Sequence, residues 1–186
     1  MPFYFDNYNT GDLELIKKQL NSKEVFICGI YKRCKYGFPQ IILLNPIKKN
    51  QEEESFNFDT LSNIMWLTCP YLNNKIHELE NDSYIKKIKI IIQNTPSFKN
   101  RMLKAHADYY YMRSLIFQKY AHSIQRKELD LSETGIGGMR DLSSIKCLHL
   151  HYCHYNLCKD NIAGLITFQL LQKNTNCDNA FCSGYK

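Results

Sequence analysis

The chain has 186 residues, of which 44% are hydrophobic and 13% aromatic. This length and composition suit one folded domain with its own core, and they exclude a disordered or low-complexity chain. The net charge is +6 at pH 7, a mild excess. The basic runs at residues 86–89 and 99–104 are typical of solvated helix faces. Binding of nucleic acid is therefore permitted by charge but supported by no motif.

The sequence contains no recognisable targeting or membrane-spanning segment. The N-terminal residues lack a basic region followed by an apolar run, and no stretch approaches about 18 consecutive apolar residues. We therefore expect a cytoplasmic protein without a membrane partner. Thiols stay reduced in that compartment, so the eight cysteines are better interpreted as metal ligands, reactive thiols or core residues than as disulfides.

The N-terminal part of the chain predicts a helix followed by a β-hairpin. A candidate N-cap and apolar residues at helical spacing predict a helix over residues 11–21. Residues 24–31 and 40–45 are rich in β-branched and apolar side chains and predict two strands, joined by a turn at 32–39. The polar residues 48–57 show no period, so we expect a mobile loop there.

The middle of the chain predicts a third strand and three helices. Residues 61–67 are typical of a strand, and 69–81 of a helix with proline in its first turn. Residues 82–93 carry isoleucines at helical spacing, and a long helix is expected over 95–123. The apolar stripe of that long helix is expected to face the core and consists of Phe98, Met102, Ala105, Tyr109, Met112, Ile116 and Tyr120.

The C-terminal part of the chain predicts a glycine-containing loop and two more helices. The loop covers residues 126–141, a helix starts at one of the two following serines and spans 143–158, and a last helix spans 160–173. Residues 174–186 are expected to form a loose tail. The fold class is α+β: a single domain, with a small antiparallel sheet from the N-terminal half covered by several C-terminal helices.

Residues 135–161 concentrate ligand chemistry, with three of the six histidines and three of the eight cysteines. On a helix, Cys147, His151, His154 and Cys158 would share one face, and neighbours on it could bind one ion. Cys147 and Cys158 cannot share an ion, because eleven residues of helix span about 16 Å. Some ligands must therefore come from elsewhere in the chain. The alternative is that this face is simply buried.

The place of His149 depends on where the helix begins. If the helix already includes Ser144, then His149 points to the opposite face. If Cys147 lies in an irregular first turn, His149 can turn towards it.

The glycine-rich loop offers a second, weaker candidate site. Gly137 and Gly138 precede a predicted helix start, and Arg140 and Lys146 are nearby, a pattern that could bind an anion. The loop lacks the Gly-Lys-Ser/Thr of a phosphate-binding loop, so a tight turn with positive φ is the preferred interpretation.

Three blocks of the chain resemble a bacterial family. The segments RCKYGFPQII, IMWLTCPYL and GIGGMRDLSSIKCLHLHYCHYNLCKDNIAG are similar, in order, to blocks of the family catalogued as domain of unknown function 501, over residues 31–164. The chain differs from the family pattern in two places. Residues 161–164 are NIAG where the family has Asn-Pro-x-Gly, and residues 57–60 are NFDT where the family has Pro-Phe-Pro-Thr. The family pattern falls on Arg33, Cys34, Gly37, Pro39, Trp66, Cys69, Pro70, Gly138, Lys146, Cys147, His149 and His154.

The resemblance reorders the candidate ligands. It implies a metal site assembled from three separated blocks, with Cys34, Cys69 and Cys147 joined by His149 or His154. Three thiolates and an imidazole suit zinc in a closed tetrahedral site, and the same set could hold an iron–sulfur cluster. With both histidines and an open position, a zinc-bound water could act as a nucleophile.

Two other functions remain open at this point. The first is a thiol enzyme, in which Cys147 or Cys69 at a helix N-terminus reacts with help from a nearby histidine. The second is a non-enzymatic module that binds RNA or, as the resemblance implies, a cell-division partner. The roles of Cys177 and Cys182 are left open.

Overall fold

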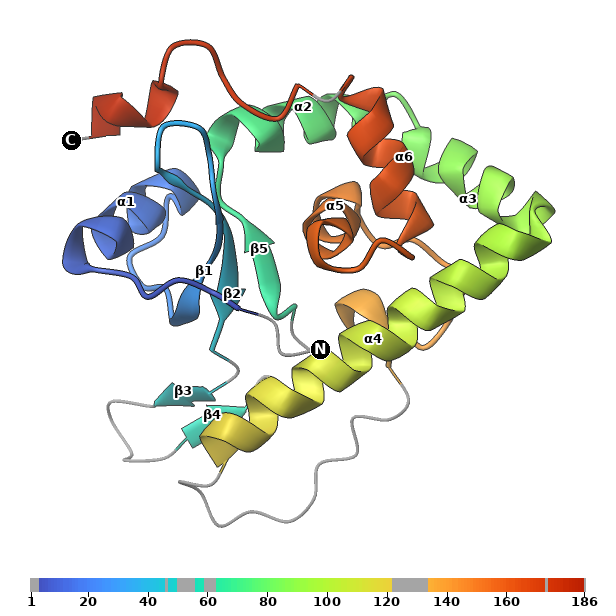
Figure 1. Cartoon of the computed structure of the whole chain (residues 1–186), viewed down its shortest axis with the longest axis horizontal. Coiled ribbons are helices and arrows are strands. Elements are labelled where there is room, and N and C mark those ends of the chain that lie inside the picture. The colour runs from blue at the N-terminus through green and yellow to red at the C-terminus, as the bar shows by residue number, and fades with distance from the viewer. Residues whose placement is uncertain are drawn as a thin grey trace.

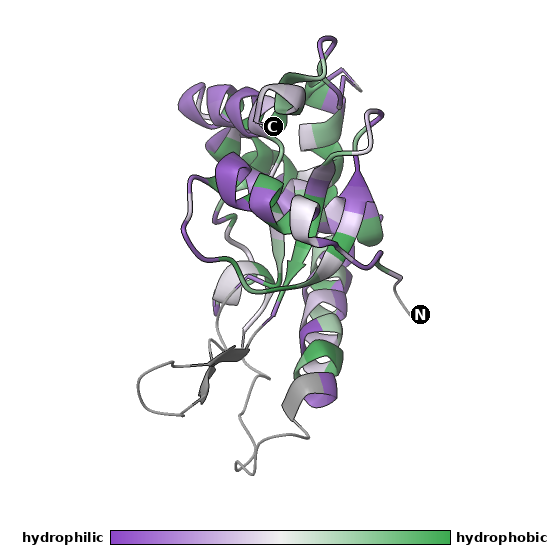
Figure 2. Ribbon diagram, turned by 90° about the vertical axis from the view of Figure 1, so that its left-hand side faces the viewer, coloured by the Kyte–Doolittle hydropathy of each residue, from purple (hydrophilic) through white to green (hydrophobic). Residues whose placement is uncertain are grey.

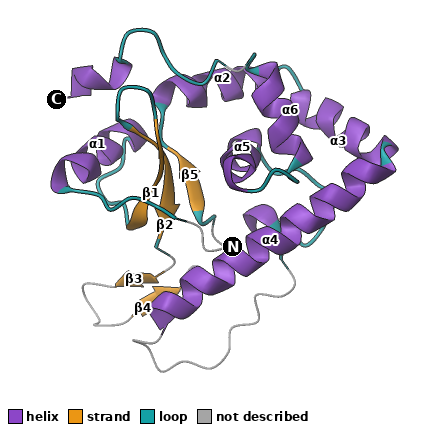
Figure 3. Ribbon diagram, in the orientation of Figure 1, coloured by secondary structure: helices purple, strands orange, loops and turns teal. Residues whose placement is uncertain are grey.

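The structure is a computed structural model of the whole chain, and it describes residues 4–45, 47–49, 56–58, 63–121, 134–172 and 174–185. A three-stranded antiparallel sheet lies on one side of the molecule and most of the helices lie on the other (Figures 1 and 3). The predicted α+β class, with the sheet in the N-terminal half, is confirmed.

The elements follow one another in an order close to the predicted one. In chain order they are α1 (Thr10–Leu20), β1 (Ile27–Arg33), β2 (Pro39–Leu44), β3 (Ile47–Lys49), β4 (Phe56–Phe58), β5 (Met65–Leu67), α2 (Pro70–Asn81), α3 (Tyr84–Asn94), α4 (Pro96–Ala121), the 3-10 turn η1 (Ile136–Gly138), α5 (Leu148–Leu157), α6 (Ile162–Leu170) and the 3-10 turn η2 (Phe181–Tyr185).

Helix α1 begins with a capping box. The side chain of Asn9 accepts a hydrogen bond from the N–H of Asp12 at 2.8 Å, and Asp12 accepts one from the N–H of Asn9 at 3.1 Å. The N-cap is therefore Asn9 and not Thr10, because this reciprocal pair satisfies two N–H groups. Asp12 also binds the guanidinium of Arg33 through both carboxylate oxygens, at 2.8 and 3.0 Å, which ties α1 to the hairpin.

The sheet has the order β1-β2-β5, and all its neighbours are antiparallel. The predicted hairpin of β1 and β2 is confirmed. Strand β2 is central and almost entirely buried, because both of its faces are covered. Ile41 and Leu43 point into the large core shared with the helices, whereas Ile42 points into a smaller core beneath α1. This alternation follows from the two-residue period of a strand.

Strands β3 and β4 pair as a second, two-stranded sheet, with Ile47 opposite Phe58. The loop expected over residues 48–57 begins and ends within these two strands. Residues 50–55, like residues 61 and 62 of the predicted third strand, lie outside the described part of the chain.

The helices pack their apolar faces against the sheet and against one another. Figure 2 shows hydrophilic and hydrophobic residues together on single helices, as expected for amphipathic helices. The predicted stripe of α4 is buried at Met102, Ala105, Tyr109, Met112 and Ile116. Residues 122 and 123, the predicted end of this helix, are not among the described ones. Among the described helices, none combines the length and hydropathy needed to cross a bilayer.

Helix α5 begins later than its sequence predicts. The side chain of Asp141 accepts hydrogen bonds from the N–H and hydroxyl of Ser143, at 2.9 and 2.7 Å, and from the hydroxyl of Ser144. The predicted capping serines are thus used in a turn. The helix starts at Leu148 with Cys147 as its N-cap. This is the irregular start that allows His149 to turn towards Cys147.

The C-terminal segment returns to the hairpin and to α1. It passes above α2 in Figure 1 and ends in η2, which contacts α1. The sequence predicts a loose tail here, and the structure describes hydrogen bonds from it to residues 35, 36 and 40.

Candidate metal centre

The first cluster of potential ligands lies where the start of α5 meets the end of α2. The N–H of Leu148 donates to Oε1 of Glu80 at 2.6 Å, and Nδ1 of His149 lies 3.3 Å from the same oxygen. One ligand atom from each of Glu80, Cys147 and His149 lies within 4.8 Å of the other two. The three side chains are therefore close enough to bind one ion, and we call them the Glu80 cluster.

The hydrogen bonds of His149 define its tautomer. Its Nε2 lies 3.1 Å from the backbone carbonyl oxygen of Asn73, which can only accept a hydrogen bond. Nε2 therefore carries a proton, and in the neutral ring Nδ1 presents a lone pair to Glu80. A lone pair that faces a carboxylate oxygen is repelled unless a proton or a metal cation lies between them. Metal-bound histidines commonly donate their other N–H to a carbonyl in this way.

The Glu80 cluster is accessible from solvent. His149 exposes 25% of its side chain and Glu80 exposes 18%. Cys147 and His149 line a pocket of about 550 Å³. Trp66 of β5 lines the same pocket and is 41% exposed, so a ligand could reach the cluster from this side.

Burial disfavours the thiolate form of the two cysteines at helix N-termini. Burial raises the pKa of Cys147, and the carboxylate of Glu80 adds to this effect, against the opposing influence of N–H groups at the start of α5. Burial likewise raises the pKa of Cys69 at the start of α2. The helix-dipole effect expected from sequence is therefore outweighed by desolvation.

The second cluster lies at the other end of α5. Asp108 of α4, His154 of α5 and Cys158, the C-cap of α5, also have ligand atoms within 4.8 Å of one another. Nε2 of His154 lies 3.4 Å from Oδ2 of Asp108, which is longer than a well-formed hydrogen bond. We call these residues the Asp108 cluster.

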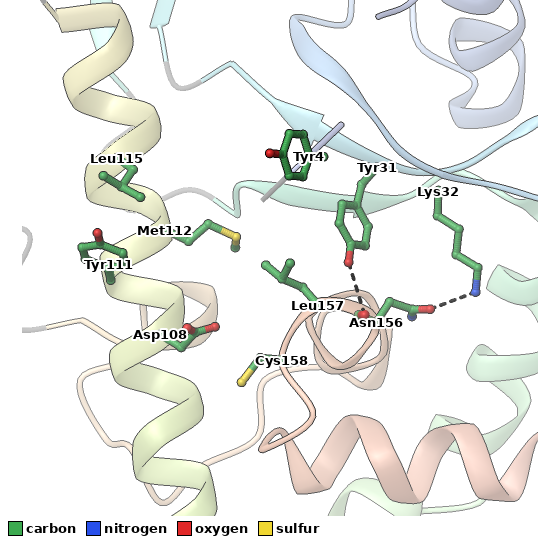
Figure 4. A pocket seen from close by; sticks show the side chains of 10 residues that line it. All are labelled: Tyr4, Tyr31, Lys32, Asp108, Tyr111, Met112, Leu115, Asn156, Leu157 and Cys158. Carbon is green, nitrogen blue, oxygen red and sulfur yellow. Dashed lines mark hydrogen bonds between the residues drawn. The ribbon is translucent and has the colours of Figure 1, made fainter. Parts of the chain in front are cut away.

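The Asp108 cluster borders the larger pocket, of about 760 Å³ (Figure 4). In this view Asp108 and Cys158 approach each other from α4 and from the end of α5. Tyr31 and Lys32 of β1 form another wall, since their hydroxyl and ammonium groups donate to the carbonyl and side-chain oxygens of Asn156, at 3.2 and 2.8 Å.

The side chain of Asn161 decides the tautomer of His154. Its Oδ1 accepts hydrogen bonds from the N–H of Gly164 at 2.9 Å and from Nδ1 of His151 at 3.2 Å. Its Nδ2 must therefore be the group that lies 3.1 Å from Nδ1 of His154, and it donates there. Nδ1 of His154 is an acceptor, so Nε2 carries the proton and faces Asp108. A protonated nitrogen cannot bind a metal, so the residues present do not fit an ion at this cluster.

Three histidines are buried as neutral rings around this helix. Burial lowers the pKa of His106 to about 4 and that of His151 to about 3. Burial also lowers the pKa of His154, although Asp108 opposes this effect. Nδ1 of His106 accepts a hydrogen bond from the N–H of Ile136 at 3.0 Å. In all three rings Nδ1 has a partner and Nε2 has no hydrogen bond.

The five predicted metal ligands lie in different places. Cys147 meets His149 in the Glu80 cluster, and His154 belongs to the Asp108 cluster. Cys34 lies in the hairpin turn and Cys69 is the N-cap of α2, and neither belongs to the two clusters.

Sequence reasoning missed the two carboxylates. Glu80 and Asp108 lie on predicted helices among other charged residues, and nothing in their spacing distinguishes them. Asp108 follows His106 by two residues, which is a weak signal. Cys158 lies outside the family pattern, yet it lies beside Asp108.

The glycine-rich loop has few free donors for an anion. Gly137 and Gly138 both have φ of 73°, as the interpretation of a tight turn predicts. The N–H of Gly138 donates to the carbonyl of Gly135, and the ammonium of Lys146 donates to the carbonyl of Gly137 at 3.1 Å. Arg140 is exposed. Anion binding by these residues stays a prediction.

The fold and the two clusters define a class: a small α+β protein with thiol, imidazole and carboxylate groups gathered at both ends of one buried helix. Residues 30–169 match the model of a family described as protein of unknown function (DUF501). This match spans most of the chain, so the protein belongs to that family, as its three sequence blocks indicated. No curated protein and no solved structure matches the chain.

Proposed function

We propose that the protein binds zinc at Glu80, Cys147 and His149, with a further coordination position open to the adjoining pocket. The observation that carries this proposal is the hydrogen bond between Nε2 of His149 and the carbonyl of Asn73. It leaves the lone pair of Nδ1 directed at a carboxylate, and a bound cation turns that repulsion into attraction. The N–H of Leu148 further orients Glu80.

The ligand chemistry favours zinc. Zinc takes thiolate sulfur, imidazole nitrogen and carboxylate oxygen, and three protein ligands with an open position are typical of catalytic zinc. At such a position zinc polarises a water molecule or a substrate group. An iron–sulfur cluster usually requires four thiolates, and the Glu80 cluster contains one.

A competing state explains the same contacts without a metal. An imidazolium ring at His149 would donate to both Asn73 and Glu80. The zinc-bound state and this metal-free state differ in metal content, so elemental analysis distinguishes them. The alternative of a thiol enzyme is less favoured, because burial raises the pKa of both candidate nucleophiles, Cys69 and Cys147.

The test is elemental analysis of tag-free protein, together with cobalt substitution. The single substitutions Cys147→Ser and His149→Ala should each remove about one equivalent of zinc per chain. The matched control is Cys158→Ser, which alters the Asp108 cluster and should retain the metal. With cobalt, the Glu80 cluster should contribute sulfur-to-metal absorption from a single thiolate, and Cys147→Ser should remove that contribution.

The outcomes are distinct. If Cys147→Ser and His149→Ala keep the full metal content of the wild type, then the Glu80 cluster binds no metal and the proposal is wrong. If Cys158→Ser loses metal while Cys147→Ser does not, the metal is bound by the Asp108 cluster and not by the Glu80 cluster.

A further inference from the structure

Four cysteines that belong to neither cluster gather around one short stretch of backbone, Pro39 and Gln40. Cys34 lies in the hairpin turn just before this stretch. Its N–H donates to the carbonyl of Phe38, and its carbonyl accepts from the N–H of Gly37, both at 2.9 Å. The turn thus folds Cys34 back over the start of β2.

Cys69 reaches the same stretch from β5. The preceding residue, Thr68, donates its N–H to the carbonyl of Gln40 at 2.9 Å and its hydroxyl to the carbonyl of Pro39 at 3.0 Å. Cys69 itself is 6% exposed.

The C-terminal segment brings two more cysteines there. The carbonyl of Thr175 accepts from the side chain of Gln40, and the side chain of Asn176 accepts from the N–H of Lys35, both at 2.8 Å. These contacts hold the residues just before Cys177 against the hairpin.

Cys182 is tied to the same point through α1. The side-chain amide of Gln19 donates to Sγ of Cys182 at 3.2 Å and to the carbonyl of Pro39 at 3.0 Å. Cys182 is 5% exposed. A thiolate in such a place needs N–H donors or a cation, and Gln19 supplies one donor.

The thiols also influence one another. Burial is the main cause that raises the pKa of Cys69, and Cys182 and Cys177 add to it. Burial likewise raises the pKa of Cys182, with contributions from Cys34 and Cys177. The thiol of Cys177 therefore lies close enough to those of Cys69 and Cys182 to interact with both electrostatically.

We propose that Cys34, Cys69, Cys177 and Cys182 form a second, structural zinc site that fastens the C-terminal segment to the hairpin and to the start of α2. Four thiolates from separate segments suit a closed tetrahedral site. Among the described residues no three of these sulfurs lie within 4.8 Å of one another. Rotation about a single side-chain bond moves a sulfur by up to about 3 Å, so the proposal requires these side chains to turn towards one another when the metal binds.

The test uses the full chain and the double substitution Cys177→Ser/Cys182→Ser, which leaves the hairpin and α2 unaltered. The wild type should hold about two zinc ions per chain, and the double variant about one. Cobalt should give the strong absorption of four thiolates in the wild type and only the single-thiolate signal in the double variant. Cys158→Ser serves as the control and should keep both ions.

Each outcome decides the proposal. The proposal is supported if the double variant loses both one zinc ion and the four-thiolate cobalt absorption. This result does not depend on whether Cys147→Ser removes metal from the Glu80 cluster. Unchanged metal content in the double variant overturns the proposal. A disulfide between Cys177 and Cys182 in the unreduced protein, seen as two missing hydrogens in its mass, also overturns it. So does brown protein that contains iron instead of zinc.

Discussion

Replacing Tyr109 by phenylalanine tests the hydrogen bond that connects the long helix α4 to the residue just before β5. Tyr109 is completely buried on α4, and its hydroxyl accepts a hydrogen bond from the backbone N–H of Ile64 at 2.9 Å. Ile64, just before β5, is 1% exposed, so water cannot replace the lost acceptor. Tyr109→Phe therefore leaves a buried N–H without a partner.

The expected loss of stability follows from that unpaired donor. A buried N–H without an acceptor costs about 1–3 kcal/mol. The void left by one hydroxyl adds only about 0.3 kcal/mol. For a chain of this length, a loss of about 2 kcal/mol lowers Tm by roughly 4–8 °C.

The assay is urea unfolding followed by circular dichroism, with zinc content measured in parallel. Tyr111→Phe is the matched control, because Tyr111 lies on the same helix and is 54% exposed. Its stability should change by less than about 0.5 kcal/mol. If Tyr109→Phe also loses less than about 0.5 kcal/mol, the hydrogen bond to Ile64 does not hold the sheet to α4, and the reasoning is refuted.

Two further predictions concern the packing of α5. A Cβ on Gly164 would lie 2.1 Å from the carbonyl oxygen of His151, so Gly164→Ala should cost about 1–3 kcal/mol in urea unfolding despite a helix-propensity gain of about 1 kcal/mol. Gly184→Ala, with nothing within 4 Å, should be neutral, and equal stability of the two variants would contradict this close approach. Burial lowers the pKa of His106 from 6.5 to about 4, so its contribution to stability is complete above pH 6.5 and lost as the pH falls towards 4. At pH 5 this loss is about 2 kcal/mol; His106→Asn should therefore reduce the pH dependence of the free energy of unfolding between pH 6.5 and 4, and an unchanged pH dependence would contradict this role of His106.

The fold was predictable where local pattern and tertiary packing agree. The stripe of α4 and the apolar run of β2 are buried as their periods indicate, because a 26-residue helix and a central strand repeat the signal many times. The start of α5 was not predictable, because Ser143 and Ser144 are good capping residues in either context. Only the contact with Asp141 assigns them to a turn.

The candidate site was predictable only in part. Cys147 and His149 are two positions apart in the chain, so their proximity could be predicted from the sequence for a helix with an irregular start at Cys147. The sequence could not supply Glu80, because the packing of α2 against α5 is a contact between residues nearly seventy positions apart. For the same reason the sequence could not assign roles to Cys177 and Cys182, because the cysteines proposed to join them, Cys34 and Cys69, are more than a hundred positions away.

The side-chain nitrogen of Asn161 controls the tautomer of His154, because it donates a hydrogen bond to Nδ1 of that ring. Deamidation, or the substitution Asn161→Asp, exchanges its nitrogen for an oxygen and removes the donor to Nδ1 of His154. That ring nitrogen would then need the proton itself, and a neutral His154 would present a lone pair at Nε2 to Asp108 and Cys158. The tautomer of His154, and with it the chemistry of the Asp108 cluster, therefore depends on the amide nitrogen of a residue outside that cluster.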